Sequence, residues 1–275
     1  MAITNFIPTI WSENLLTSLD RRYIAAANCN RDFEGDIKSR GSKVKICGVG
    51  DITIGDYTKD TDMSTPQDLE DTVAELVIDQ AKYFNFQVDD IDKTQCSPKL
   101  LDAAMRNAAS ALANEADKYI FSLHTGAAKN VDADLATDSI IDTILSAREY
   151  LYQHDVADPS DIVIEISPVV ATKLIKEQTE TFSYNNDVLA SGCIGSVAGC
   201  KVFVSNNVEI EDGPVQVHHC LMRSKRAIAY AEQLSEIEAY RPEKRFADAV
   251  KGLHLYGAKV VFPYELVDMQ ITVEE

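Results

Sequence analysis

The residue groups that could carry cofactor chemistry are few, and each lacks the spacing that such chemistry needs. Gly48-Val49-Gly50 follows a predicted strand, but Thr53 stands where a dinucleotide-binding loop needs its third glycine, and another strand follows where a helix should begin. Gly195 and Gly199 with Lys201 also lack the spacing of a phosphate-binding loop. Neither glycine pair therefore predicts a nucleotide site.

Histidines and carboxylates offer equally little. In the run His218-His219-Cys220, adjacent side chains on a strand point to opposite faces, so His218 and His219 cannot both face one ion. Asp89 and Asp90 could supply an acid and a base, but nothing in the sequence places two carboxylates across a pocket. Serine-nucleophile and zinc-protease motifs do not occur. We therefore expect no catalytic residue, no metal site and no cofactor.

The cysteines are scattered along the chain. No pair has the two-residue spacing that is typical of zinc ligands or a redox dithiol. The six are Cys29, Cys47, Cys96, Cys193, Cys200 and Cys220. We expect them to be buried, reduced thiols in the cytoplasm.

Composition predicts a folded, soluble chain of one or two domains. Of the 275 residues, 45% are hydrophobic and 25% are charged, which is ordinary usage. No run approaches the roughly 20 apolar residues that span a bilayer, and the first ten residues do not form a secretion signal. The formal net charge of -18 argues against a surface that binds nucleic acid, because such surfaces rely on lysine and arginine.

The charge is unevenly distributed. Residues 51 to 92 carry twelve acidic side chains against two lysines, whereas residues 21 to 45 carry seven basic side chains against three acids. Solvated surfaces would explain both segments, and complementary contact between neighbouring copies would explain them equally well. On the second interpretation, the candidate contact residues are Lys43, Lys45, Lys59, Asp60, Asp62, Asp68 and Asp71.

A long hairpin is predicted next to a short helical stretch. Residues 10 to 27 show helical spacing, residues 43 to 54 alternate with period two, and a return strand runs from Thr72 to Val88. Because a lone hairpin is at best marginally stable, something outside it must support it. Few large apolar residues lie near its tip, so we expect contact with another copy of the chain there.

Helices and strands alternate through the rest of the chain. The longest helix begins at Ser97 and Pro98 and ends near Leu123. An acidic loop follows, and then a helix capped by Thr137 or Asp138. A further helix starts at Ser167-Pro168. Strands are expected at 162–166, 201–205, 215–222 and 227–231, with a final pair at 249–262 and 266–273. The fold class is therefore α+β.

Seven stretches, taken in order, resemble one known family. They are Leu76 to Gln80, Phe86 to Asp92, the helix near Ser97, Ile162 to Ile164 running into Ser167-Pro168, Ile194 to Val202, Ala227 to Ala231, and Phe246 to Gly257. Their order and spacing resemble the major capsid proteins of tailed phages with the Hong Kong 97-type fold. The resemblance covers essentially the whole chain.

This resemblance implies a division of the chain. It predicts an N-terminal arm over residues 1–40 and an extended β-hairpin loop over 41–78. A peripheral domain with a long spine helix would cover 79–135 and 241–275, and an axial domain would cover 136–240. Self-assembly into the pentamers and hexamers of an icosahedral shell is implied, with double-stranded DNA enclosed without sequence-specific binding.

Partners and alternatives follow from the same resemblance. A separate scaffolding protein, a portal and decoration proteins are implied, with assembly in the host cytoplasm and a final location in the virion. No membrane is involved. An encapsulin-like nanocompartment shell is similar to the same fold and is the first alternative. A cytosolic enzyme that uses carboxylate acid/base chemistry is the alternative from another class.

Overall fold

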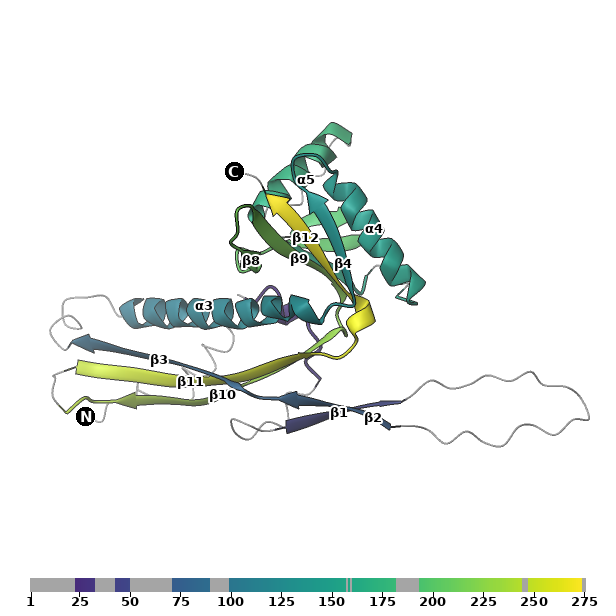
Figure 1. The fold of residues 1–275 in the computed structure, drawn as a ribbon. Coiled ribbons are helices and arrows are strands. Elements are labelled where there is room, and N and C mark those ends of the chain that lie inside the picture. The colour runs from purple at the N-terminus through teal and green to yellow at the C-terminus, as the bar shows by residue number, and fades with distance from the viewer. Residues whose placement is uncertain are drawn as a thin grey trace, which may run out of the picture.

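The computed structural model describes residues 23–32, 43–49, 71–89, 99–156, 158, 160–181, 193–243 and 247–273. Three sheets organise these residues (Figure 1). A two-stranded ribbon pairs β1 (Lys43–Val49) with β2 (Asp71–Val77), and a three-stranded sheet has the order β10-β11-β3. The third sheet has seven strands in the order β4-β12-β9-β5-β7-β6, with β8 paired to β9. The fold is therefore mixed α and β, as the sequence predicts.

The three-stranded sheet carries the long helix on one face. Its strands are β3 (Gln80–Asp89), β10 (Ile228–Tyr240) and β11 (Ala247–Val260), and the helix above them is α3 (Lys99–Phe121). The buried residues of α3 recur every three or four positions and include several alanines, which lets the helix lie close to its neighbours. They are Met105, Ala109, Leu112, Ala113, Ala116, Ile120 and Phe121.

The seven-stranded sheet and its helices form the second part of the molecule (Figure 1). Its strands are β4 (Lys129–Asp134), β5 (Ile162–Ile166), β6 (Cys193–Val197), β7 (Cys200–Val204), β8 (Ile210–Glu211), β9 (Gln216–Ser224) and β12 (Leu266–Val273). Two helices lie beside it, α4 (Ile140–Gln153) and α5 (Pro168–Thr181). The 3-10 turns η1 (Ala26–Asn28), η3 (Ser122–Gly126) and η4 (Pro263–Glu265) complete the described elements.

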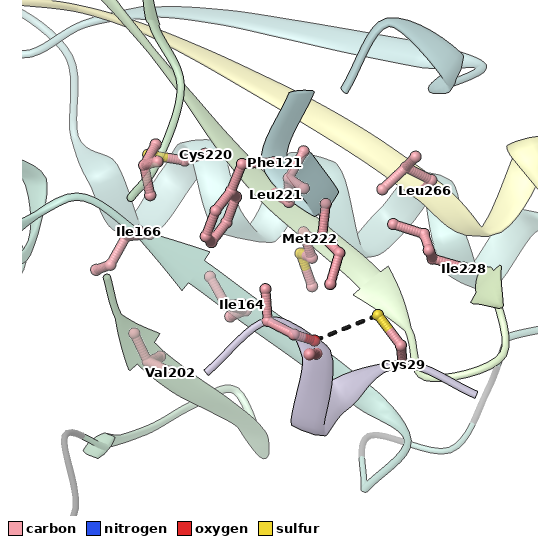
Figure 2. Packing of buried hydrophobic residues seen from close by; sticks show 14 of the residues in the cluster. Cys29, Phe121, Ile164, Ile166, Val202, Cys220, Leu221, Met222, Ile228 and Leu266 are labelled. Atoms are coloured by element: carbon pink, nitrogen blue, oxygen red, sulfur yellow. Dashed lines mark hydrogen bonds between the residues drawn. The ribbon is translucent and has the colours of Figure 1, made fainter. Parts of the chain in front are cut away.

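One hydrophobic core joins the two larger sheets. It contains Phe121 of α3, Ile164 of β5, Met222 of β9 and Leu266 of β12, all essentially inaccessible to solvent. Figure 2 shows these side chains in one cluster, with Cys29 at its edge on the segment that precedes the ribbon. Cys29, Cys200 and Cys220 are free and buried, which agrees with the expectation for these thiols.

Several predicted elements need correction. The return strand predicted from Thr72 to Val88 is two strands, because the chain leaves the ribbon at Ile78 and Asp79 and then pairs with β11. The final two strands form as predicted, and they lie in different sheets: β11 in the three-stranded sheet and β12 in the seven-stranded sheet. The acidic loop contains strand β4, whose parallel partner is β12.

The start of α4 also differs from its prediction. Ser139, rather than Thr137 or Asp138, is the N-cap, and its hydroxyl oxygen accepts a hydrogen bond from the amide of Asp142 at 3.4 Å. Glu177 on α5 accepts from the amides of Ile140 and Ile141, at 3.2 Å each. A carboxylate from a distant helix therefore completes a cap that local sequence predicts one or two residues too early.

The sheets divide the chain at different points from the predicted domains. Residues 228–240, expected in the axial domain, form β10 of the three-stranded sheet. Residues 266–273, expected in the peripheral domain, form β12 of the seven-stranded sheet, between β9 and the edge strand β4 of residues 129–134. Long-range strand pairing, which local patterns do not encode, sets these memberships.

Candidate subunit interface

The base of the β1–β2 ribbon packs on its own molecule. The strands are antiparallel, with Val44 opposite Leu76 and Ile46 opposite Ala74. Alternation places one face of the ribbon against the three-stranded sheet. The buried cluster on that face contains Val44, Ile46, Leu76, Ile78, Ala229, Ala231 and Leu255. The same chain thus supports the base, whereas the predicted contact with another copy concerns the tip, residues 50–70, which lies outside the described residues.

A glycine permits this packing. A Cβ atom on Gly257 would lie 2.3 Å from the carbonyl oxygen of Val77 and 3.1 Å from the Cα of Ile78. Both are backbone atoms, so they cannot swing aside as a side chain could. The absence of a side chain at position 257 therefore lets β11 approach the point where the chain leaves the ribbon.

The opposite face of the ribbon is charged. Lys43 and Lys45 are exposed there, and the Nζ of Lys43 lies 2.7 Å from Oε2 of Glu75 on β2. The hydrogen bond and charge of Lys43 lower the pKa of the Glu75 carboxyl. A basic residue of one predicted charged segment therefore pairs with an acid of the other segment inside one molecule.

The predicted contact residues are only partly described. Asp71 begins β2 opposite Val49, while Lys43 and Lys45 lie toward the other end of the ribbon. Lys59, Asp60, Asp62 and Asp68 lie outside the described residues. The structure adds Glu75 to this surface, and the alternation of β2 is the sequence signal that could have identified it.

Residues 23–32, which we call the latch segment, contact α3 and both larger sheets. Asp117 of α3 accepts hydrogen bonds from the backbone amides of Ile24 at 3.0 Å, Ala25 at 3.1 Å and Ala26 at 3.0 Å. Burial raises the pKa of the Asp117 carboxyl to about 6, although these three amides act in the opposite direction. The carboxyl is thus the acceptor that the first amides of η1 require.

A buried ion pair holds the other side of the latch segment. Arg223 of β9 donates from Nη2 to Oε1 of Glu165 at 2.9 Å and from Nε to Oε2 at 3.1 Å, and both side chains are completely buried. The same guanidinium donates to the carbonyl oxygens of Asn28 at 2.8 Å and Ala25 at 3.0 Å. Arg223 therefore links the seven-stranded sheet to the latch backbone.

Glu232 of β10 forms further hydrogen bonds with the latch segment. Its carboxylate accepts from Tyr23, from Arg31 at 2.5 Å, from Tyr230 at 2.8 Å, and contacts the Nε2 of His254 at 2.9 Å. Burial alone would raise its pKa, but His254, Tyr23 and Arg31 together lower it, so the carboxylate is held ionised. Asn30 also forms a parallel bridge with Ala229 of β10. The latch segment is thus bound to both larger sheets.

A hollow on the surface offers little for catalysis. It has a volume of about 290 Å³ and is lined by Asp155, Val156, Asp158, Asp161, Ser224, Lys225 and Arg226. Hydrogen bonds from Ser160 lower the pKa of Asp158, which is the opposite of what a general acid needs. From the predicted acid/base pair, Asp89 lies on β3, and Asp90 is outside the described residues.

His219 has neighbours that the sequence patterns do not predict. His124 and Asp268 lie with it in a group of possible metal ligands, although 95 and 49 positions separate them from His219 in the chain. No spacing rule connects residues so far apart. His218, as predicted from strand alternation, is not part of this group.

Comparison with known proteins identifies the class of this fold. No protein-family model matches the chain, and no curated protein matches it. A solved structure from Mycobacterium phage Che8 is 30% identical, with a TM-score of 0.68 over 90% of each chain. The capsid of Ralstonia phage GP4 is 13% identical, with a TM-score of 0.70 over 94% of this chain and 91% of that chain. The capsid of cyanophage P-SCSP1u is 15% identical, with a TM-score of 0.66, and the match covers 90% of this chain and 86% of that chain.

These likenesses extend over nearly the whole chain, and the fold is that of a capsid subunit. The chain belongs to the major capsid proteins of tailed phages, a structural component of the virion. The matched structures are of capsid proteins rather than enzymes. Among the described helices, none is long and apolar enough to cross a bilayer.

Proposed function

We propose that this subunit self-assembles into pentamers and hexamers, which close into an icosahedral shell around a double-stranded DNA genome. The observation that carries the proposal is the match to phage capsid structures over about nine tenths of the chain. The supported base of the β1–β2 ribbon leads into residues 50–70, which in this proposal lie across a neighbouring subunit. The chain has no enzymatic role in this proposal.

The sheets suggest how the subunit is divided. We assign residues 1–40 to an N-terminal arm and 41–78 to an extended loop. The peripheral domain then consists of the three-stranded sheet with α3 as its spine helix, and the axial domain consists of the seven-stranded sheet with α4 and α5. Sheet membership supports moving β10 into the peripheral domain and β12 into the axial domain.

Contacts between copies would use the charged ribbon. In the proposal, Lys43 and Lys45 on the ribbon face a neighbouring subunit, together with Lys59, Asp60, Asp62, Asp68 and Asp71. Lys43 and Lys45 are exposed, which supports their availability. Charged groups at such an interface fix the register of two copies more than they increase affinity.

Charge also suits a shell that encloses DNA. A formal net charge of -18 keeps free subunits apart, and it disfavours binding of the enclosed phosphates to the wall. The genome would then be enclosed without sequence-specific contact. A scaffolding protein, a portal and decoration proteins, with assembly in the host cytoplasm, complete the proposal and depend on the family resemblance.

Electron microscopy tests the proposal. The chain should be expressed with the open reading frames that neighbour it, and the purified particles should be imaged by negative stain. Closed shells of uniform diameter that contain DNA are expected. Shells that contain a cargo enzyme would instead indicate a nanocompartment. A chain that stays monomeric at high concentration, with all neighbouring products present, would contradict the proposal.

A further inference from the structure

Three polar side chains from three separate elements meet where the long helix reaches the seven-stranded sheet. They are His124 of η3, His219 of β9 and Asp268 of β12. The Nδ1 of His219 lies 2.9 Å from Oδ2 of Asp268, and the Nδ1 of His124 lies 3.3 Å from the same oxygen. The two imidazole rings stack, with centroids 3.8 Å apart.

Strand pairing fixes two members of this group on one face. His219 lies directly opposite Gln270 in the antiparallel β9–β12 ladder. Asp268 is two residues before Gln270, so it points to the same face as His219. The backbone of the sheet, rather than mobile loops, therefore sets the positions of His219 and Asp268. His124 reaches them from the turn that follows α3.

The Asp268 carboxylate is buried with few partners. It is 1% exposed, and its Oδ1 has no hydrogen-bond partner among the described residues. Gln270 donates to Oδ2 at 3.2 Å, and the ion-pair contacts described for this carboxylate are with the two imidazoles. A buried carboxylate needs a positive charge nearby, because its desolvation is otherwise costly.

Both ring nitrogens of His219 face carboxylates. Nδ1 faces Asp268, and Nε2 lies 3.8 Å from Oε2 of the exposed Glu211. A neutral imidazole carries a single N–H, so one nitrogen would direct its lone pair toward a negative oxygen. A cation held between Nδ1 and the Asp268 carboxylate would remove that conflict.

We propose that His124, His219 and Asp268 bind one divalent transition-metal ion, with Zn²⁺ as the simplest candidate. Two imidazole nitrogens and one carboxylate oxygen are ligands that Zn²⁺ accepts, with a water in the fourth position. Bonds of about 2.0–2.1 Å place neighbouring tetrahedral ligands roughly 3.3 Å apart. The observed separations of 2.9 and 3.3 Å are close to this value, and the two stacked rings must also turn so that both Nδ1 lone pairs point at the ion.

The outer contacts suit such an ion. With Nδ1 on the metal, His219 carries its proton on Nε2, toward Glu211, in the manner of a carboxylate that orients a metal-bound histidine. The ion would tie η3, at the end of α3, to the adjacent strands β9 and β12. Its role is to fix the long helix relative to the seven-stranded sheet, and this goes beyond the shell-forming function proposed above.

Metal content and coordination test the proposal. The full-length protein is dialysed against ZnCl₂, then against metal-free buffer, and bound zinc is measured by mass spectrometry. The wild type is expected to keep one Zn²⁺ per subunit and to unfold at a higher temperature with zinc than without it. His124→Gln, His219→Gln and Asp268→Asn should each lose at least tenfold in zinc affinity. His154→Gln, a change at an exposed histidine of the α4 cap, should bind zinc as the wild type does.

X-ray absorption of the zinc-loaded wild type keeps the test decisive even if a variant fails to fold. Nitrogen and oxygen ligands at about 2.0–2.1 Å are expected, with two imidazoles. Sulfur at about 2.3 Å would assign the zinc to cysteines and overturn the proposal. Failure of the wild type to retain zinc would overturn it too, as would folded ligand variants that bind zinc normally. None of these outcomes bears on whether the protein forms shells.

Discussion

Arg223 and Glu165 form a bidentate ion pair with no solvent exposure. The same guanidinium donates hydrogen bonds to two carbonyl oxygens of the latch segment. The pair thus does more than neutralise two charges inside the core. Through Arg223 it connects the seven-stranded sheet to residues 23–32, which also contact α3 and β10. A chain segment that reaches several elements at once can hold their relative positions.

Removing one partner of this pair should be costly. Arg223→Met leaves the Glu165 carboxylate buried without its cation, and we expect the free energy of unfolding to fall by about 3–5 kcal/mol. Glu165→Gln should cost a similar amount. The double variant Arg223→Met with Glu165→Met should cost clearly less than the two single losses combined, because no isolated charge remains. Urea unfolding of the purified subunit measures all three.

A surface pair provides the control. Lys251 lies 2.6 Å from Glu238, and both side chains are more than half exposed. Lys251→Met should therefore change the free energy of unfolding by no more than about 1 kcal/mol. Equal losses for Lys251→Met and Arg223→Met would show that the burial of the Arg223 pair has no special consequence.

Asp117 should give the latch a dependence on pH. Its carboxyl has a pKa of about 6 in the fold, because burial raises it from an ordinary value of 3.8. The folded state then holds the proton more tightly than the unfolded state does. The stability that Asp117 contributes is greatest below about pH 4 and is lost as the pH rises through 6.

The variant Asp117→Asn tests this pH dependence of stability. Asparagine resembles the protonated acid in shape and keeps an acceptor oxygen, but it does not titrate. Between pH 4 and pH 7, the stability of the variant should improve relative to the wild type by about 2 kcal/mol. Urea unfolding at several pH values measures this difference, in which shared groups such as Glu165 largely cancel. Parallel stability curves for the two proteins would refute the role given to the buried carboxyl.

Gly257→Ala should loosen the base of the ribbon. The added Cβ would meet the Val77 carbonyl oxygen at 2.3 Å, so backbone must move, and we expect a loss of about 1–3 kcal/mol. The exchange rate of the backbone amide hydrogens should rise across residues 74–78. Gly252→Ala is the matched control, because its Cβ would meet the partly exposed ring of Phe84, which can rotate away. If the two variants are equally stable, the close approach of the backbone at Val77 is not the reason that position 257 needs glycine.

Sequence patterns predict where helices and strands lie better than which elements they contact. The helical period identified α3, and the Ser167-Pro168 start identified α5, because both signals are local. The sequence does not predict β4, because only Val131 and Ala133 of its six residues are apolar. The latch contacts were not predictable: Arg223 lies 195 and 198 positions from the carbonyls that it holds. Such contacts are products of the completed fold.

The charges of the ribbon should affect assembly rather than folding. Changing Asp60, Asp62, Asp68 and Asp71 together to lysine should strongly reduce shell yield, because like charges would then meet where opposite charges fix the register. The ribbon base should remain intact, since the apolar cluster around Leu76 and Ile78 is untouched. Circular dichroism of the unassembled subunit should therefore match the wild type.

The comparison variant changes the formal charge equally at another surface. Asp132, Glu149, Glu209 and Asp212 are exposed residues of the part that contains the seven-stranded sheet, and together they are changed to lysine. If total charge governed assembly, both variants would fail alike. If the ribbon charges set the register, only the ribbon variant loses its shells in sedimentation and electron microscopy. Normal shell yield from the ribbon variant would reject the contact role of these aspartates, because a reversed charge at a packed interface costs several kcal/mol.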